Sequence, residues 1–247
     1  MFGLPDRLPV SDKNLRRRVL WPLGTTLVVL LCLFLIIFQV YLQRELSRNL
    51  DEHVAAVANL YKDLLRERSG TMQSLINLIQ QDERLQTSMI RKDRDELLRQ
   101  TNSLFRELLT EQNITHFYFH DSDSVNFLRV HKPDRFGDPI DRLTMRQSRS
   151  GIQVASGAEM GPLGTFTLRV VTPWFSGGQL IGFIELGEEI EPLLERLTTQ
   201  TGSQMAIIIK KKLLDRTLWE EGQVMLGRST AWSYLPEHVI TATTDNQ

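Results

Sequence analysis

The sequence predicts an α+β protein that begins with one membrane-spanning helix. Residues 19–43 contain no charged side chain, and a helical apolar pattern follows them to residue 112. After Asn113 the spacing of apolar residues changes from three or four to two, which is the period of a strand. Helices and hairpins then alternate along the chain, so we expect an antiparallel sheet with flanking helices.

The uncharged segment is long enough to cross a bilayer. A hydrocarbon core about 30 Å thick needs roughly 20 apolar residues in a helix, and residues 27–38 are Leu, Val, Ile and Phe apart from Cys32. The run is too long for a cleaved signal peptide, and no small-residue cleavage pattern follows it. We therefore interpret residues 19–43 as an uncleaved transmembrane helix that follows a tail at 1–18.

The charges on either side of this segment predict its orientation. Lys13 and the arginines at 16–18 precede it, whereas acidic and basic residues nearly balance after it. Short flanks rich in Lys and Arg stay in the cytoplasm, so we expect the tail inside and the bulk of the chain outside. The only cysteine, Cys32, lies within the segment, which excludes a disulfide framework. The net charge of -1 gives no sign of nucleic-acid binding.

Residues 44–112 are predicted to form a long helix and a second helix, separated by a densely charged stretch at 82–93. Apolar residues recur here at spacings of three and four. Because a long helix is unstable alone in water, its membrane-proximal part at 46–57 is expected to pack on a second copy of the chain as a parallel homodimer. The alternative is that the whole apolar stripe faces the protein's own core.

Two hairpins are predicted in the rest of the chain. The first joins residues 116–120 to 125–131, and the second joins 165–173 to 180–186. The other expected elements are a loop at 133–139, a short helix at 143–152, a glycine-rich stretch at 157–164, a helix at 191–199 and strands at 205–209 and 239–243.

Three segments carry a family resemblance. Residues 127–138 (FLRVHKPDRFGD), and then 168–173 (LRVVTP) with 178–190 (GQLIGFIELGEEI), resemble the two hallmarks of the double-Cache sensor domains of bacterial receptors. Residues 210–219 (KKKLLDRTLW) resemble the entry to the later region of that family, and the resemblance extends over about residues 44–243.

The resemblance implies an organisation and a function. It implies a PAS-like sensor module at residues 113–200 and the start of an incomplete membrane-proximal module at 201–247. It implies a single-pass protein of the bacterial inner membrane whose periplasmic bulk binds a small molecule. Such domains feed a histidine kinase, a diguanylate cyclase or a chemotaxis domain. The chain ends at Gln247, so we expect either an N-terminal part of a receptor or a truncated stand-alone product.

One face of the predicted sheet carries polar residues that are candidates for ligand binding. Two buried arginines, Arg129 and Arg169, need anionic partners, and the planar fork of Arg129 suits a carboxylate. We therefore predict a small organic acid or an amino acid as ligand. The alternatives are that Arg129 and His131 brace the loop at 133–138 and that Arg169 pairs with Glu185 across strands. The candidate residues are Tyr118, His120, Arg129, His131, Arg169 and Glu185.

No enzyme, metal or cofactor is expected in this chain. Nucleophile-elbow, zinc-protease, P-loop, kinase and cyclase signatures are all absent. His116 and His120 would lie about 13 Å apart along one strand, too far to share an ion. A structural, membrane-anchored dimerisation protein without ligand and a periplasmic hydrolase stay open as alternatives. A sensor predicts a closed pocket lined by polar groups, whereas a scaffold predicts an apolar, filled sheet face.

Overall fold

The computed structural model describes residues 20–161, 163–228 and 230–245. The chain divides into two compact units, residues 1–56 and 57–247. Helix α2 (Trp21–Gln80) starts in the first unit. By length and composition it is the one helix in these ranges that could cross a membrane, with a mean hydropathy of 2.6 over its most apolar window. Its apolar side chains from Trp21 to Val54 are exposed.

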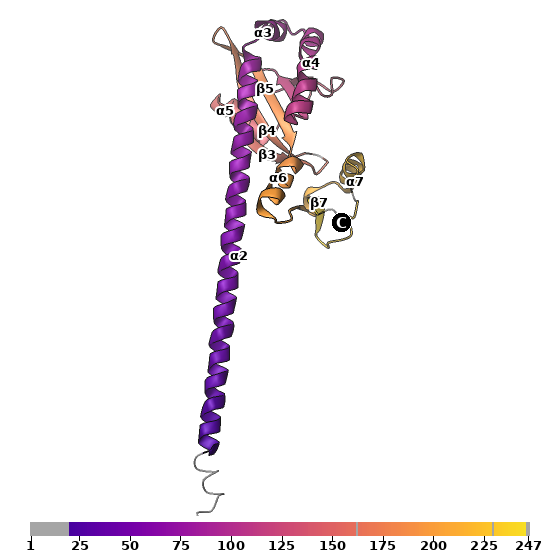
Figure 1. Ribbon diagram of the computed structural model, residues 1–247. Helices are drawn as coiled ribbons and strands as arrows, with labels where there is room; N and C mark the ends of the chain where they lie inside the picture. Colours follow the sequence, from indigo (N-terminus) through magenta and orange to yellow (C-terminus); the bar gives the residue numbers. More distant parts are fainter. Residues whose placement is uncertain (1–19, 162, 229, 246–247) are drawn as a thin grey trace, which may run out of the picture. The chain divides into compact units, whose positions relative to one another are not determined.

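The second unit is built on a five-stranded antiparallel sheet with the strand order β2-β1-β5-β4-β3 (Figure 1). Strand β1 pairs with β2, and β3, β4 and β5 pair in succession. Strand β5 joins these two groups by pairing with β1. The strands are β1 (His116–His120), β2 (Asn126–Arg129), β3 (Ala155–Met160), β4 (Phe166–Ser176) and β5 (Gln179–Glu189). The α+β class expected from the sequence is confirmed.

Glycines shape the central hairpin at two places. Gly177 and Gly178 both have positive φ, which is the geometry of a two-residue turn between twisted strands. Gly182 has φ +155, and a Cβ there would lie 2.2 Å from the backbone oxygen of His120. Only glycine therefore allows β5 to approach β1 so closely at His120.

One face of the sheet is apolar and packs on helices. The outer part of α2 contributes Leu64, Met72 and Ile76 to this core, and Phe117 and Phe119 of β1 point into it. Burying each such side chain stabilises the fold by about 1.5–3 kcal/mol. The other helices that supply residues to this core are α3 (Glu83–Ile90), α4 (Arg94–Gln112) and α6 (Glu191–Thr201).

The opposite face is covered by the segment that follows β2. Helix α5 (Leu143–Gly151) packs on β3 and β4. Ile140 and Met145 form a small apolar cluster there with Val171 and Phe183 of the sheet. The remainder of this face is polar.

A smaller C-terminal substructure follows α6. It contains the hairpin of β6 (Ala206–Lys210) and β7 (His238–Thr243), the turn η2 (Lys211–Leu213) and helix α7 (Arg216–Met225). Its core is formed by Ile209, Trp219 and Val239. Gly164, in the turn between β3 and β4, has φ +73, and a Cβ there would lie 2.7 Å from the Trp219 ring. The absence of a side chain at this glycine therefore lets the turn pack against α7.

Three elements differ from the sequence expectation. The charged stretch at 82–93 contains α3, because Leu85 and Met89 are buried and Asp82 caps the helix by accepting from the Arg84 N–H. The glycine-rich stretch contains most of β3, an edge strand held by its pairing with β4. Helix α7 was not expected, and Asp215 caps it by accepting from the Leu218 N–H.

Candidate functional site

The polar face of the sheet is organised by strand register. Arg129, Tyr118 and Glu185 lie side by side across β2, β1 and β5. The alternation predicted for β1 is confirmed, because Phe117 and Phe119 enter the core on the other face. Local period-two patterning thus brings the candidate residues of three strands into one row.

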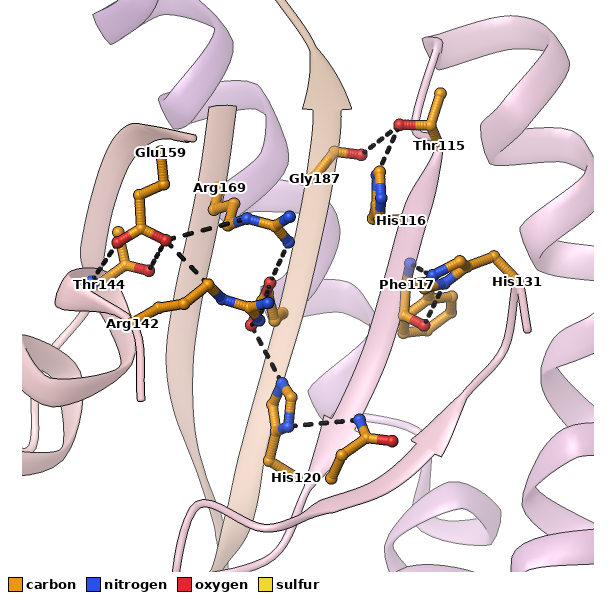
Figure 2. Close-up of polar contacts among 12 residues, drawn as sticks. Thr115, His116, Phe117, His120, His131, Arg142, Thr144, Glu159, Arg169 and Gly187 are labelled. Carbon is orange, nitrogen blue, oxygen red and sulfur yellow. Dashed lines mark hydrogen bonds and ion pairs between the residues drawn. The ribbon is translucent and has the colours of Figure 1, made fainter. Parts of the chain in front are cut away.

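Glu185 is the centre of a buried ion network. Its carboxylate is fully buried and accepts hydrogen bonds from His120 Nε2 at 3.0 Å, Arg142 Nη2 at 2.6 Å and Arg169 Nη1 at 2.7 Å. Figure 2 shows the side chains of His120, Arg142 and Arg169 converging between the strands. Burial acts to raise the pKa of Glu185, but the charge of Arg142, the hydrogen bond from His120 and the charge of Arg169 hold it well below its usual range. Glu185 is therefore an anion at neutral pH.

His120 joins this network as a neutral ring. Burial lowers its pKa, and this effect outweighs the hydrogen bond to Glu185. With Nε2–H donating to Glu185, Nδ1 is free to accept from Asn126 Nδ2 at 3.5 Å. The hydrogen bonds thus hold the ring in one orientation on the polar face.

Arg142 and Glu159 belong to the site but were not among the predicted residues. Thr144 holds the Glu159 carboxylate through its N–H at 2.8 Å and its hydroxyl at 3.1 Å. Arg142 Nε and Arg169 Nε face Glu159 Oε2 at 3.7 and 3.9 Å, and neither Nε has a hydrogen-bond partner among the described residues. Arg142 precedes a helix that the sequence predicts, but Glu159 lies on the strand that it does not predict, so no sequence pattern paired them.

Arg129 makes a two-pronged contact within the protein. Its Nη1 and Nη2 donate to Asp138 Oδ1 and Oδ2 at 2.7 and 2.6 Å, and Nη1 also donates to the Arg135 carbonyl at 2.7 Å. The hydrogen bond from Arg129 lowers the pKa of Asp138. The sequence suggested that Arg129 either binds a ligand or braces the loop at 133–138, and these contacts are those of a loop brace. Likewise, the contact between Arg169 and Glu185 is the cross-strand ion pair considered as its alternative role.

Tyr118 lies among three cations. The guanidinium carbons of Arg129, Arg142 and Arg169 are 5.6, 5.4 and 5.9 Å from the centre of its ring. His131 contacts the edge of the same ring, with the ring centres 4.7 Å apart. A guanidinium over an aromatic ring is attracted by the ring's quadrupole, so Tyr118 lowers the cost of gathering three like charges.

His131 follows the end of β2 rather than lying in the strand as expected. It still reaches the predicted face. Its Nδ1 lies 3.2 Å from the backbone N of Phe117 and 3.3 Å from the Phe117 oxygen. Burial lowers the pKa of His131 to about 4 and that of His116 to about 3, so both rings are neutral at physiological pH.

The observed face matches neither of the two patterns expected from the sequence. It is polar, as a sensor site requires, but its charges are largely paired within the protein. Arg129 has Asp138, and Arg142 and Arg169 share Glu185. In the part of the chain that the structure describes, no group of three or more His, Cys, Asp and Glu side chains could hold a metal ion.

A family model described as the double sensory domain of two-component sensor kinases matches residues 47–227. The chain belongs to this double-Cache family. The match starts within α2 and ends just after α7, so it includes the whole five-stranded sheet and the polar face. No curated protein sequence matches the chain.

Solved structures of sensor domains are similar to this double-Cache chain. One is a domain of a sensory box/GGDEF family protein from Vibrio parahaemolyticus, with 16% identity over 62% of this chain and 69% of that chain and a TM-score of 0.46. The periplasmic domain of Vibrio cholerae LuxQ has 14% identity over 63% and 74%, with a TM-score of 0.44. The ligand-binding domain of the Pseudomonas aeruginosa PAO1 amino acid chemoreceptor PctB, in complex with L-Gln, has 17% identity over 64% and 62%, with a TM-score of 0.41.

Proposed function

We propose that this double-Cache chain is the periplasmic sensor domain of a membrane-anchored bacterial receptor and that it binds a small organic anion. The family membership, the apolar first part of α2 and the arginine cluster on the polar face support the proposal. The observation that carries the choice of ligand is the two-pronged contact of buried Arg129 with the partly exposed carboxylate of Asp138.

Arg129 and Asp138 differ in burial, and this difference suits ligand exchange. The side chain of Arg129 is 6% exposed, whereas that of Asp138, in the loop after β2, is 37% exposed. A ligand carboxylate presents the same two oxygens to the same fork. It could therefore replace Asp138 without leaving Arg129 buried and unpaired. Tyr118, His120, His131, Arg169 and Glu185 would line the site around it.

Arg169 and Glu185 have a different part in the proposed site. Both are buried, and each is a partner of the other at 2.7 Å. Removing Glu185 would leave Arg169 buried without its closest anion, so we do not expect a ligand to replace Glu185. The pair would instead keep its own contact while Arg129 changes partner.

Strand β5 offers a path from the site to α2. Glu185 lies on the polar face, and Glu188 lies on the opposite face. There Arg68 of α2 donates to Glu188 through Nε at 2.9 Å and to the Gln112 carbonyl at 2.8 Å. A shift of β5 on ligand binding would therefore move a charge that is bonded to α2, and a small shift in a packed element can be transmitted.

Calorimetry tests the ligand proposal. The full chain in detergent micelles is titrated with a panel of small carboxylates, including amino acids. Losing one charged bond typically costs about 2–5 kcal/mol, so Arg129→Ala should weaken binding about 30- to 4000-fold. Asp138→Asn is the matched control: it removes the competing carboxylate and should bind at least as tightly as wild type. If folded Arg129→Ala binds a ligand as well as wild type, Arg129 serves the loop alone.

The proposed orientation places the N-terminus in the cytoplasm. Lys13 and the arginines at 16–18 support it through the preference of basic flanks for that side. Reporter fusions after Gln247 test it. A fusion that is active only in the cytoplasm contradicts the orientation.

We also propose a parallel homodimer through the membrane-proximal part of α2. Leu46, Leu50 and Val54 share one stripe there, and their exposed fractions exceed one half. Cysteine at Leu50, in a Cys32→Ser background, should crosslink to its own copy in membranes more efficiently than cysteine at Glu52. Equal crosslinking at both positions would argue against this seam and against signalling through a helical dimer.

A further inference from the structure

Glu189 lies where β5 meets α6, and one oxygen of its carboxylate has no hydrogen-bond partner in the described chain. It is the last residue of β5, two positions before the first residue of α6. Its Oε2 is buried and has no hydrogen-bond partner in the described chain. The nearest basic atom is His116 Nδ1 at 3.8 Å, and that nitrogen is already 2.8 Å from the Thr115 hydroxyl. The proposed ligand contacts do not use this carboxylate.

The charges around Glu189 come from every element that packs on it. Glu191 of α6 is a second acid, and its Oε2 is also buried and unpartnered in the described residues. The cations are Arg169 of β4 and Arg228, which follows α7. Burial and the charge of Glu191 raise the pKa of Glu189 to about 7, against the opposing effect of the two arginines and of a hydrogen bond with the Thr167 side chain.

Arg228 connects this acidic pair to the C-terminal substructure. Its Nη2 lies 2.8 Å from Glu191 Oε1, and its Nη1 donates to the Thr241 carbonyl of β7 at 3.2 Å. The Thr241 hydroxyl in turn donates to the Gly164 carbonyl at 2.7 Å, in the turn between β3 and β4. One chain of contacts thus joins the start of α6, β7 and the tip of the β3–β4 hairpin.

We propose that Glu189 is a proton-operated latch between the sheet and the β6–β7 substructure. When Glu189 is neutral, Arg228 stays on Glu191 and the chain of contacts through Thr241 is intact. When Glu189 loses its proton, a second buried negative charge lies beside Glu191 and competes for Arg228. The attachment of the β6–β7 substructure therefore weakens as the surrounding pH rises. This latch is separate from the proposed ligand binding. It rests on the proposed periplasmic location only in that the pH to which Glu189 responds would be that of the periplasm.

Two measurements on the full chain in detergent micelles test the latch. The first is the pH titration of glutamate side-chain carboxyl carbons by NMR, with the Glu189 signal assigned by its loss in Glu189→Gln. The second is hydrogen exchange of the peptides over α7 and β7, compared between pH values after correction for the intrinsic rate. We expect a Glu189 midpoint near 7 and faster exchange above it. Glu189→Gln should keep the slow exchange at every pH.

Two further variants keep the test decisive even if Glu189→Gln folds poorly. Glu191→Gln removes the like charge and should lower the Glu189 midpoint by about one unit or more. Glu195→Gln, an exposed acid on the same helix, should leave the midpoint and the exchange unchanged. A Glu189 midpoint in the ordinary range of glutamate, or a pH dependence of exchange that is the same in Glu189→Gln and wild type, overturns the proposal.

Discussion

Two glutamates on the polar face of β5, Glu185 and Glu189, have pKa values shifted in opposite directions. Glu185 is fully buried, yet Arg142, His120 and Arg169 keep its pKa well below the usual value. Glu189, four residues and two pleat repeats further along the same face, is less buried, yet its pKa is raised to about 7. The more buried carboxylate is therefore the stronger acid.

The difference lies in the partners rather than in the burial. Desolvation raises the pKa of any buried carboxylate, and nearby cations or hydrogen bonds lower it. At Glu185 three donors lie within 3.0 Å, whereas at Glu189 the nearest basic atom is 3.8 Å away and a second glutamate adds repulsion. The same strand thus carries a permanent anion at Glu185, in its interior, and a group that can change charge at Glu189, its last residue.

Replacing Glu185 should cause the largest loss of unfolding free energy. Glu185→Ala leaves Arg169 buried without its anion and removes a partner of Arg142 and His120. Loss of one partner of a buried pair costs about 3–5 kcal/mol, and we expect a loss of unfolding free energy of that size in urea denaturation of the full chain in micelles. The matched variant Glu189→Ala should lose far less at pH 8. Equal losses at the two positions would contradict the distinction.

The neutral histidines beside Glu185 should make the fold sensitive to acid. Burial lowers the pKa of His116 to about 3 and that of His131 to about 4, from 6.5. Because the folded pKa is depressed, the stability is present above pH 6.5 and is lost as the pH falls toward these values. We expect each of the two histidines to contribute a loss of about 2–3 kcal/mol between pH 6.5 and 4. His116→Gln should reduce the dependence of stability on pH, measured by thermal unfolding at several pH values. An unchanged dependence would show that His116 does not contribute to the acid sensitivity.

Glu189 should act in the opposite direction. Its folded pKa is raised from 4.5 to about 7, so its contribution to stability is complete below pH 4.5 and is lost as the pH rises through 7. Glu189→Gln should therefore stabilise the chain at pH 8 by about 1–2 kcal/mol and have little effect at pH 4. Glu195→Gln should stay within about 0.5 kcal/mol at both pH values, as exposed substitutions usually do. A stabilisation of equal size at pH 4 would show that the charge of Glu189 is not the cause.

Replacing Arg142 should have the smallest effect on stability of these variants, the Glu195→Gln control aside. Its side chain is 24% exposed, and Glu185 keeps Arg169 and His120 when Arg142 is removed. Arg142→Met should cost about 1 kcal/mol and should raise the pKa of Glu185, because the largest lowering influence is gone. Urea denaturation and the carboxyl NMR titration measure the two effects. A loss as large as that of Glu185→Ala would mean that Arg142, not the carboxylate, organises the network.

The sequence alone determined the features that depend on local spacing. The uncharged run at 19–43 indicated a helix long and apolar enough to cross a membrane, and the period-two pattern at 116–120 placed Tyr118 and His120 on one face of the sheet. The family resemblance was carried by contiguous motifs, and the family match confirmed it. These properties are readable because side-chain direction along a strand or a helix repeats over two to four residues.

Only the tertiary structure decided which charges meet. Arg129 has Asp138 as its partner because the loop after β2 folds back over the strand, and Arg142 reaches Glu185 because α5 packs on the sheet. Glu185 and Glu189 stand in one short stretch of similar residues, and nothing in that stretch tells them apart. Arg142, His120 and Arg169 lower the pKa of Glu185 from distant positions in the sequence, and of the charges that act on Glu189 only Glu191 is a sequence neighbour. A pattern read along the chain does not contain the distances on which electrostatic energies depend.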